Sequence, residues 1–251
     1  PVGASSGFNL YSPTFVRGLK KEELPEMARA YGHAVNLARE AGFDAVEIHA
    51  GHGYLISQFL SPYTNRRKDC FGGSLENRMR FMDMVMEEVM KAAGTDMAVL
   101  VKVNMRDGFR GGMEMDETMQ VAKRLEQSGA HALVLSGGFV SKAPMYVMRG
   151  QMPIHSMTHY MNCWWLKYGV RMVGKWMIPT VPFKEAYFLE DALKFRAEIK
   201  MPLVYVGGLV SREKIDEVLN DGFEAVQMAR ALLNEPGFVN RMREEEKAIC
   251  N

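Results

Sequence analysis

The run from His49 to Tyr54, His-Ala-Gly-His-Gly-Tyr, places two imidazoles and a phenol within six residues. Imidazole N–H groups can donate hydrogen bonds to an oxyanion that develops during a reaction, and a phenol can deliver a proton. The small residues between them let a ligand approach the backbone closely. His49 and His52 could also bind zinc, but no nearby carboxylate or cysteine completes a convincing ligand set, so we expect no metal. The residues alone are equally compatible with two histidines that only stabilise the end of a strand.

A repeated pattern marks the points where helices end and strands begin. In three places an amphipathic stretch is followed by glycine and a short apolar run, at residues 41–48, 128–135 and 221–228. Glycine supplies the left-handed residue after a helix, and a short apolar run is typical of a buried parallel strand. With two further apolar runs, the sequence predicts five strands, near residues 44–49, 97–104, 131–136, 202–207 and 224–229. Helical patterns begin at the N-caps Ser74 and Ser211 or lie between the strands, at about 20–41, 74–93, 116–128, 184–199 and 211–220.

Strands that alternate with helices predict an α/β fold with a parallel sheet and right-handed crossovers. The length of 251 residues is typical of one (β/α)₈ barrel. However, only five strands are recognisable, and the first 40 residues contain only a glycine- and serine-rich start and one helix. The chain therefore forms either a smaller open sheet or a barrel without its first three βα units. In both cases the carboxyl ends of the strands are the expected place for an active site, and His49 lies at such an end.

A longer motif follows the two histidines. Residues 47–55 read EIHAGHGYL, and residues 65–78 read NRRKDCFGGSLENR. These segments resemble the old yellow enzyme family of FMN-dependent oxidoreductases in both residue type and spacing. Phe71 replaces the family's usual tyrosine, and Cys70 falls at a variable position. The resemblance implies a TIM (β/α)₈ barrel of the FMN-linked oxidoreductase type, present only as strands four to eight, with residues 1–251 as a single FMN-binding domain truncated at its N-terminus.

The resemblance assigns catalytic roles to the first cluster. In this family a His-x-x-His or His-x-x-Asn pair holds the carbonyl oxygen of the substrate above the flavin, so His49 and His52 inherit that role. The tyrosine two residues further on protonates the α-carbon of the substrate, and Tyr54 matches it. Hydrogen bonds to the carbonyl oxygen stabilise charge that appears only in the transition state.

Other residues match the positions that bind the flavin in this family. Lys102 stands where the family usually places an arginine, or sometimes a lysine, beside the N1/O2 edge of the flavin; a strand-end lysine that extends to water is the alternative. Gly207 and Gly208 match the positions where glycine lets the phosphate of FMN approach the backbone, and Arg230 matches the arginine that pairs with its charge. Ala229 stands where glycine is common in this family. A further glycine after the third strand is expected to border the flavin. The predicted cofactor-binding residues are Lys102, Gly137, Gly207, Gly208, Ala229 and Arg230.

The resemblance also implies a reaction. FMN is the expected cofactor, and NADH or NADPH is the expected reductant. The predicted reaction transfers hydride to the β-carbon of an activated alkene in a small, enone-like substrate, an α,β-unsaturated carbonyl compound. A dienoyl-CoA reductase, an amine dehydrogenase relative and a non-catalytic fragment unable to hold FMN are the alternatives.

The composition excludes several other classes of protein. A net charge of +1 gives no reason to expect a nucleic-acid partner or a membrane partner. No apolar run approaches the roughly 18–20 residues that span a bilayer, and no signal peptide is recognisable. Three widely spaced cysteines argue against a disulfide framework and favour the cytoplasm. The methionine-rich segment from Met105 to Met177 holds all three tryptophans. It predicts a lid or a wall of the substrate pocket, with apolar packing or a subunit contact as the alternatives, so a homo-oligomer stays open.

Overall fold

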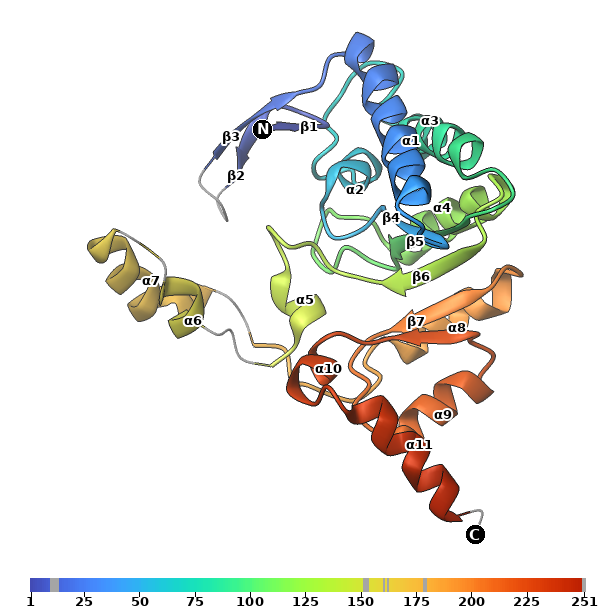
Figure 1. Cartoon of the computed structure of the whole chain (residues 1–251). Helices are drawn as coiled ribbons and strands as arrows, with labels where there is room; N and C mark the ends of the chain where they lie inside the picture. Colours follow the sequence, from blue (N-terminus) through green and yellow to red (C-terminus); the bar gives the residue numbers. More distant parts are fainter. Residues whose placement is uncertain (10–13, 151–153, 160, 162, 178–179, 250–251) are drawn as a thin grey trace.

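The computed structural model describes residues 1–9, 14–150, 154–159, 161, 163–177 and 180–249. Within them, five parallel strands form one sheet in which the order of the strands follows the chain (Figure 1). These strands are β4 (Ala45–His49), β5 (Ala98–Asn104), β6 (Ala132–Ser136), β7 (Leu203–Val206) and β8 (Ala225–Gln227). Each lies within two residues of its predicted range, which confirms the α/β class.

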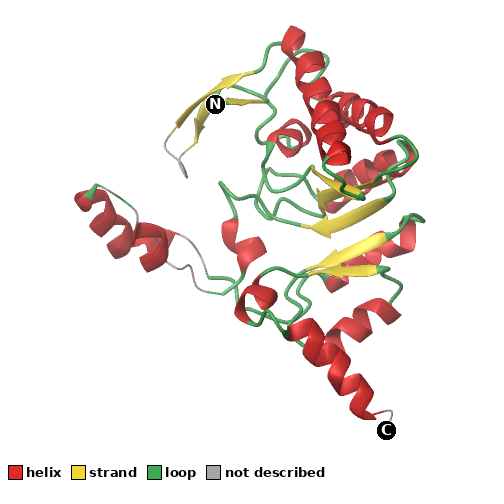
Figure 2. Cartoon of the chain, in the orientation of Figure 1, coloured by secondary structure: helices red, strands yellow, loops and turns green. Residues whose placement is uncertain are grey.

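Helices alternate with these strands along the chain (Figure 2). The five predicted helices are present as α1 (Leu24–Glu40), α3 (Leu75–Ala93), α4 (Met115–Gln127), α8 (Leu189–Glu198) and α9 (Arg212–Asn220). Both predicted N-caps are confirmed. The hydroxyl oxygen of Ser74 accepts a hydrogen bond from the N–H of Asn77 at 3.4 Å, and that of Ser211 accepts one from Lys214 at 3.3 Å.

The two faces of the sheet bury different side chains. The outer face packs into the main core beneath the helices through Val99, Val101, Val103, Leu133, Leu135, Leu203 and Tyr205. The inner face carries a second, smaller cluster of Leu100, Ala132, Val134, Val204 and Val206. Near this cluster, Oε2 of Glu47 on β4 accepts a hydrogen bond from Nε2 of Gln227 on β8 at 2.9 Å. Because β4 and β8 are the two edges of the sheet, this contact shows that the sheet curves strongly, as part of an α/β barrel does.

The N-terminal segment contains three short strands, so the prediction of only a glycine- and serine-rich start before the first helix was wrong. Strands β1 (Val2–Gly3), β2 (Gly7–Asn9) and β3 (Thr14–Gly18) form a separate sheet in the order β1-β3-β2. A short 3₁₀ turn, Lys21–Glu23, then leads into α1. Strands of two to five residues are too short to show the alternation from which strands are predicted.

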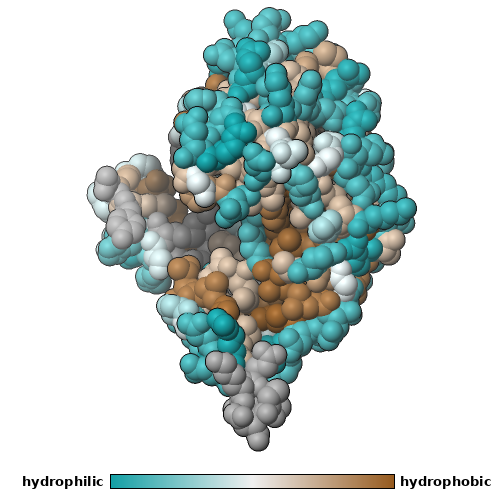
Figure 3. Space-filling view, turned by 45° about the vertical axis from the view of Figure 1, so that its right-hand side comes forward, coloured by the Kyte–Doolittle hydropathy of each residue, from teal (hydrophilic) through white to brown (hydrophobic). Residues whose placement is uncertain are grey.

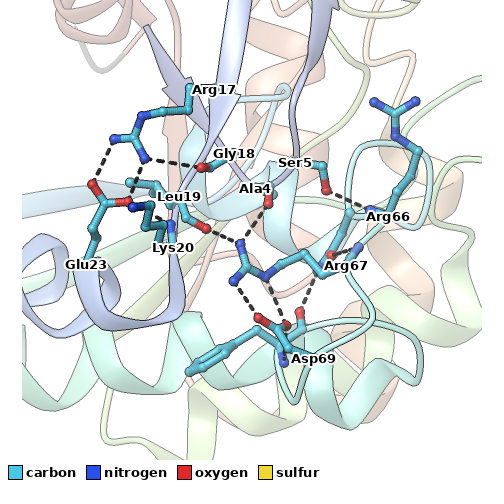
Figure 4. Close-up of polar contacts among 12 residues, drawn as sticks. Ala4, Ser5, Arg17, Gly18, Leu19, Lys20, Glu23, Arg66, Arg67 and Asp69 are labelled. Atoms are coloured by element: carbon cyan, nitrogen blue, oxygen red, sulfur yellow. Dashed lines mark hydrogen bonds and ion pairs between the residues drawn. The ribbon is translucent and has the colours of Figure 1, made fainter.

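Arg67, within the family-like motif, fixes this small sheet to the rest of the chain (Figure 4). Its guanidinium pairs with Asp69, with 2.6 Å between Nη2 and Oδ2. Nη1 of Arg67 donates hydrogen bonds to the carbonyl oxygen of Ala4, at 3.0 Å, and to that of Leu19. The carboxylate of Asp69 therefore orients a guanidinium that joins both ends of the N-terminal segment to the loop after α2 (Leu55–Leu60).

Arg78, the last residue of the same motif, is buried where three elements meet. Its side chain is only 3% exposed. The guanidinium donates a hydrogen bond to the carbonyl oxygen of Leu60 at the end of α2 and pairs with Glu117 on α4. Its Nε donates to the carbonyl oxygen of Gly73 at 3.2 Å. Arg78 thus satisfies polar groups that would otherwise lie unpaired inside the protein.

A long excursion leaves the sheet between β6 and α8. It contains α5 (Pro144–Met148), α6 (Ile154–His159) and α7 (Trp164–Met177), and α7 stands away from the sheet in Figure 1. Trp164 and Trp165 on α7 are 71% and 65% exposed, so packing into the core of this chain is not their role. The side chain of Trp176 lies outside the described residues. A lid and a subunit contact both stay predictions for this excursion.

The surface is mixed in character. Two further helices, α10 (Arg230–Asn234) and α11 (Phe238–Ile249), follow β8 and form part of this surface in Figure 1. Figure 3 shows hydrophilic side chains over much of one face and apolar side chains gathered in the middle and lower part of that face. Within the described ranges, no helix is long and apolar enough to cross a membrane.

Replacing Arg78 with alanine should destabilise the fold, because the Leu60 carbonyl and the Glu117 carboxylate lose their partner. Breaking a buried ion pair by removing one member costs about 3 kcal/mol, and we expect the free energy of unfolding to fall by about that amount. Urea denaturation followed by circular dichroism measures it. Arg80→Ala is the matched control, because Arg80 lies exposed on the same helix. An equal loss in the two variants would contradict the role given to Arg78.

Candidate active site

The carboxyl ends of the strands bring the predicted site residues to one edge of the sheet. Lys102 on β5 lies directly opposite His49, the last residue of β4. Gly137 follows β6, residues 207–208 follow β7, and residues 229–230 follow β8. The loop that holds the second histidine and the tyrosine begins at the end of β4. The predicted residues therefore share the edge at which α/β barrels build their sites.

The rings of His49, His52 and Tyr54 lie together. The ring centroids of His49 and His52 are 4.9 Å apart, and those of His49 and Tyr54 are also 4.9 Å apart. Nδ1 of His49 is buried and has no hydrogen-bond partner among the residues that the structure describes. Tyr54 is 54% exposed and is the N-cap residue of α2. A buried polar atom without a partner costs free energy, so this nitrogen points to a ligand that would complete its bonding.

Specific hydrogen bonds fix the position of His52. Its ring Nε2 lies 2.8 Å from the hydroxyl oxygen of Ser136, the last residue of β6. Its backbone has a φ of 60°, in the left-handed region that few residues other than glycine adopt. The N–H of His52 donates to the side-chain oxygen of Asn104 at 3.0 Å. Both the ring and the strained backbone of His52 are therefore held in place by neighbouring strand ends.

Two buried residues that the sequence did not single out support this loop. The side-chain nitrogen of Asn104 donates to Oδ1 of Asp107 at 2.9 Å and to the carbonyl oxygen of Gly138 at 2.8 Å. The other carboxylate oxygen of Asp107 accepts hydrogen bonds from the Ser61 hydroxyl, at 2.7 Å, and from the N–H of Met113, at 2.8 Å. Burial raises the pKa of Asp107. The available signal was a second polar residue, Asn104, that follows Lys102 at the end of a strand whose other residues are apolar.

Burial keeps both imidazoles in the neutral form near pH 7. Burial lowers the pKa of His52 to about 4. Repulsion from a protonated His49 and from the Lys102 ammonium acts in the same direction. Burial also lowers the pKa of His49, where the Lys102 ammonium adds to the effect and Glu47 opposes it. A neutral imidazole carries one N–H donor, so each histidine can donate a hydrogen bond without bringing a charge into the site.

Lys102 lies on the inner side of the curved sheet. Its Nζ is 2.6 Å from Oε1 of Glu47, and the two side chains are 16% and 28% exposed. The ammonium of Lys102 therefore pairs with a carboxylate instead of extending to water, and its role beside the flavin stays a prediction. The sequence did not predict Glu47 as its partner, because the two residues come together only when β4 pairs with β5.

The glycines after β7 lie beneath aromatic side chains of the segment that precedes α8. Gly208 has a φ of 69°, and a Cβ added there would lie 2.6 Å from the ring of Tyr187. A Cβ added at Gly207 would lie 3.0 Å from the ring of Phe188. Glycine is thus required at both positions by the packing of this chain, in addition to any ligand.

The residues after β8 complete a donor set that fits a flavin with its phosphate. Ala229 and Arg230 are exposed, and Nη1 of Arg230 donates to the carbonyl oxygen of Met148. The edge thus carries the Lys102 ammonium at β5 and a guanidinium at β8, with glycine backbone between them, which suits a ligand with an anionic end. Gly137 is buried between these two ends, beside Tyr146. No group of three or more His, Cys, Asp or Glu that could hold a metal ion occurs within the described part of the chain.

A family comparison agrees with this geometry. The sequence profile of the NADH:flavin oxidoreductase / NADH oxidase family matches residues 2–162. The chain belongs to this family. Membership of the NADH:flavin oxidoreductase family confirms the predicted resemblance, and with it FMN as the cofactor of the family and NADH or NADPH as its reductant.

Similar proteins place the chain within the family. A 4,4'-dithiodibutanoate disulfide reductase of Rhodococcus erythropolis is 38% identical over 238 residues, which are 94% of this chain and 59% of that protein. The old yellow enzyme homologue of Zymomonas mobilis matches 98% of this chain and 61% of its own, with a TM-score of 0.69 and 24% identity. A 2-naphthoyl-CoA reductase matches 98% of this chain and 33% of its own, with a TM-score of 0.77 and 22% identity.

These matches confirm the fold, but they do not establish the activity of this chain. At 22% and 24% identity, the two solved structures show the fold alone. The five-stranded sheet of this NADH:flavin oxidoreductase chain is part of a TIM barrel of the old yellow enzyme type, as predicted. The chain spans about three fifths of the length of its Rhodococcus relative. The roles of the individual site residues stay predictions.

Lowering the pH should destabilise the protein through His52. Its pKa is about 4 in the folded protein against an ordinary value of 6.5, so the unfolded chain binds the proton more readily between these values. The contribution of His52 to the free energy of unfolding is therefore complete above pH 6.5 and is lost as the pH falls towards 4. Urea titrations at each pH should show a shallower fall for His52→Asn than for the wild type.

His33→Asn is the control for this pH dependence, because His33 lies exposed on α1. Its stability curve should run parallel to that of the wild type. A His52→Asn curve that also runs parallel to the wild type would show that the buried imidazole does not carry the effect.

Proposed function

We propose that this chain forms the carbonyl-binding and phosphate-binding side of an FMN-dependent oxidoreductase that reduces the activated C=C bond of an α,β-unsaturated carbonyl compound. The observation that carries this proposal is the buried Nδ1 of His49, which has no partner among the described residues and lies beside His52 and Tyr54 at the strand edge that also holds Lys102. Because the chain spans only part of the length of its relatives, the activity is proposed for the whole protein.

The strand edge offers a place for each end of the cofactor. When bound and reduced by NADH or NADPH, FMN supplies the hydride for the β-carbon of the substrate. Lys102 would hold the pyrimidine edge of the flavin ring, where a positive charge stabilises added electron density. Gly137 would border the flavin, and residues 207–208 with Ala229 and Arg230 would hold the phosphate.

The histidine pair would bind and polarise the substrate. Neutral His49 and His52 can each donate an N–H to the carbonyl oxygen, on which negative charge develops as hydride reaches the β-carbon. The Ser136 hydroxyl, 2.8 Å from Nε2 of His52, fixes the orientation of that ring. Because the imidazoles are buried and already positioned, little reorganisation is needed when the charge appears.

Tyr54 would then complete the reaction by delivering a proton to the α-carbon. Its ring packs beside His49, so a substrate carbonyl held by the histidines would place the α-carbon near the phenol. Its exposure of 54% leaves the hydroxyl accessible for proton exchange with water between turnovers. The proton and the hydride together add the two hydrogens that saturate the C=C bond.

A second candidate function is supported by the Rhodococcus relative, whose name assigns it a disulfide substrate. Reduction of a disulfide breaks the S–S bond with two electrons and needs two protons to give two thiols. Reduced FMN would supply the two electrons and one proton, as a hydride equivalent, and Tyr54 would supply the second proton to a departing thiolate. However, a disulfide offers no carbonyl oxygen to the histidine pair. Rates with 2-cyclohexenone and with 4,4'-dithiodibutanoate distinguish the two functions.

The two half-reactions separate the roles of the residues. Tyr54→Phe should slow reoxidation of the reduced protein by 2-cyclohexenone about 10²-fold, the typical contribution of a general acid. Reduction by NADH or NADPH should be nearly unchanged, because that step needs no proton from Tyr54. Anaerobic stopped-flow absorbance of the flavin measures each half-reaction.

Tyr63→Phe is the matched control for this experiment. Tyr63 is also half-exposed, at 43%, but its ring packs against Phe109 and not against a histidine. Equal losses in both half-reactions of Tyr54→Phe would reject Tyr54 as the proton donor. A full-length protein that neither carries flavin nor binds added FMN would instead support the non-catalytic alternative.

A further inference from the structure

Arg149 occupies an unusual position just after α5. Its backbone has a φ of 53°, a left-handed conformation that is uncommon for a residue with a side chain. Its guanidinium carbon lies over three aromatic rings, 5.0 Å from the ring centroid of Tyr146, 4.5 Å from Tyr187 and 5.5 Å from Phe188. The rings attract the positive charge of the guanidinium through their faces, but they offer no acceptor to its N–H groups.

Among the described residues, Arg149 has no anionic partner. No carboxylate pairs with Arg149 within the part of the chain that the structure describes, and its Nε is buried without a hydrogen-bond acceptor. By contrast, the guanidinium groups of Arg67 and Arg78, whose side chains are 10% and 3% exposed, each pair with an acidic residue. A buried charged donor with no acceptor, on a strained backbone, costs free energy unless a ligand compensates it.

The surroundings of Arg149 place it at the phosphate end of the candidate site. Tyr187, the ring closest to the guanidinium, is also the ring that lies against Gly208. The Tyr187 hydroxyl donates a hydrogen bond to the carbonyl oxygen of Val147 at 2.7 Å, and Arg230 donates one to the carbonyl oxygen of Met148. The two residues before Arg149 are therefore tied to the strand ends of β7 and β8.

The backbone after Arg149 is tied down as well. The N–H of Gly150 donates to the carbonyl oxygen of Val181 at 2.6 Å. Hydrogen bonds on both sides of Arg149 thus hold its left-handed backbone, and the aromatic rings hold its side chain. This is the kind of preorganisation that a binding residue needs, since little freedom is left to lose when a ligand arrives.

We propose that Arg149 binds an oxyanion, a phosphate or carboxylate group, at the carboxyl edge of the sheet between β7 and β8. A planar guanidinium matches two oxygens of such a group with two parallel N–H donors. The oxyanion has two candidate sources: the phosphate of FMN, which rests on the proposed function, or a carboxylate of the substrate. A dicarboxylate such as 4,4'-dithiodibutanoate is the probe for the second source.

Binding measurements on the full-length protein test this site. Arg149→Met keeps the length of the side chain and removes the charge, whereas Arg149→Lys keeps the charge and removes the planar fork. We expect Arg149→Met to weaken binding of one of the two ligands at least 10-fold and Arg149→Lys to weaken it less. Quenching of flavin fluorescence gives the Kd of FMN for the apoprotein, and isothermal titration calorimetry gives the Kd of 4,4'-dithiodibutanoate.

Lys142→Met is the matched control. Lys142 belongs to the same excursion and also lies over a ring, 5.4 Å from the centroid of Tyr63. It should leave both dissociation constants unchanged. A loss confined to FMN assigns the site to the phosphate, and a loss confined to the dicarboxylate assigns it to the substrate.

Protection of Arg149 from chemical modification tests the same site in the wild-type protein. This experiment does not depend on whether a variant folds. A dicarbonyl reagent specific for arginine should modify Arg149 more slowly when the bound ligand covers it, as peptide mass spectrometry measures. Unchanged Kd values for both ligands in folded Arg149→Met, or modification that neither ligand slows, would overturn the proposal. Failure of the wild type to bind FMN would overturn the proposed function alone, since the dicarboxylate measurements still test Arg149.

Discussion

The side-chain amide of Asn104 is the interaction on which the candidate active site depends. Asn104 ends β5, and its amide joins loops that follow three neighbouring strands. Its oxygen accepts from the N–H of His52, while its nitrogen donates to Asp107 and to the carbonyl oxygen of Gly138. Few side chains both accept and donate in this way, and the left-handed backbone of His52 has its compensating bond here. The position of His52 in the histidine pair therefore depends on Asn104 at the end of β5.

The range of an interaction along the chain decided whether the sequence could predict it. The five strands and their helices were predicted within a few residues, because each depends on local signals: a glycine after a helix, then a short apolar run. The partners of the site residues were not predicted. Asn104 lies 52 residues from His52, and Glu47 meets Lys102 only through strand pairing. The small N-terminal sheet was missed because its strands are too short to show alternation, and the side chain that fixes it, Arg67, lies far away in the sequence.

The motif that identifies the family contains two kinds of residue. Residues 47–55 hold the candidate chemistry, whereas residues 65–78 mostly build the scaffold. Arg67 and Arg78 bind backbone carbonyls and carboxylates of neighbouring elements, and neither contacts the histidine rings. Phe71 fits the same interpretation, because it is 8% exposed and packs in the main core, where a hydroxyl is not required. A barrel type is thus recognisable from its scaffold, while the choice of substrate is left to residues elsewhere.

The excursion between β6 and α8 has a consequence for how ligands arrive. Residues 137–188, between the end of β6 and the start of α8, contain six Lys or Arg and one Glu, so this segment carries 6 − 1 = +5 in a chain whose net charge is +1. The segment leaves the sheet at its carboxyl edge, the edge that holds the candidate site, so its positive charge starts from that side of the sheet. Such a field raises the rate at which anions reach a site, by about 10-fold or more at low ionic strength. Any such attraction would weaken with added salt, because salt screens charges that lie more than about 10 Å apart, while the hydrogen bonds within the site would stay intact.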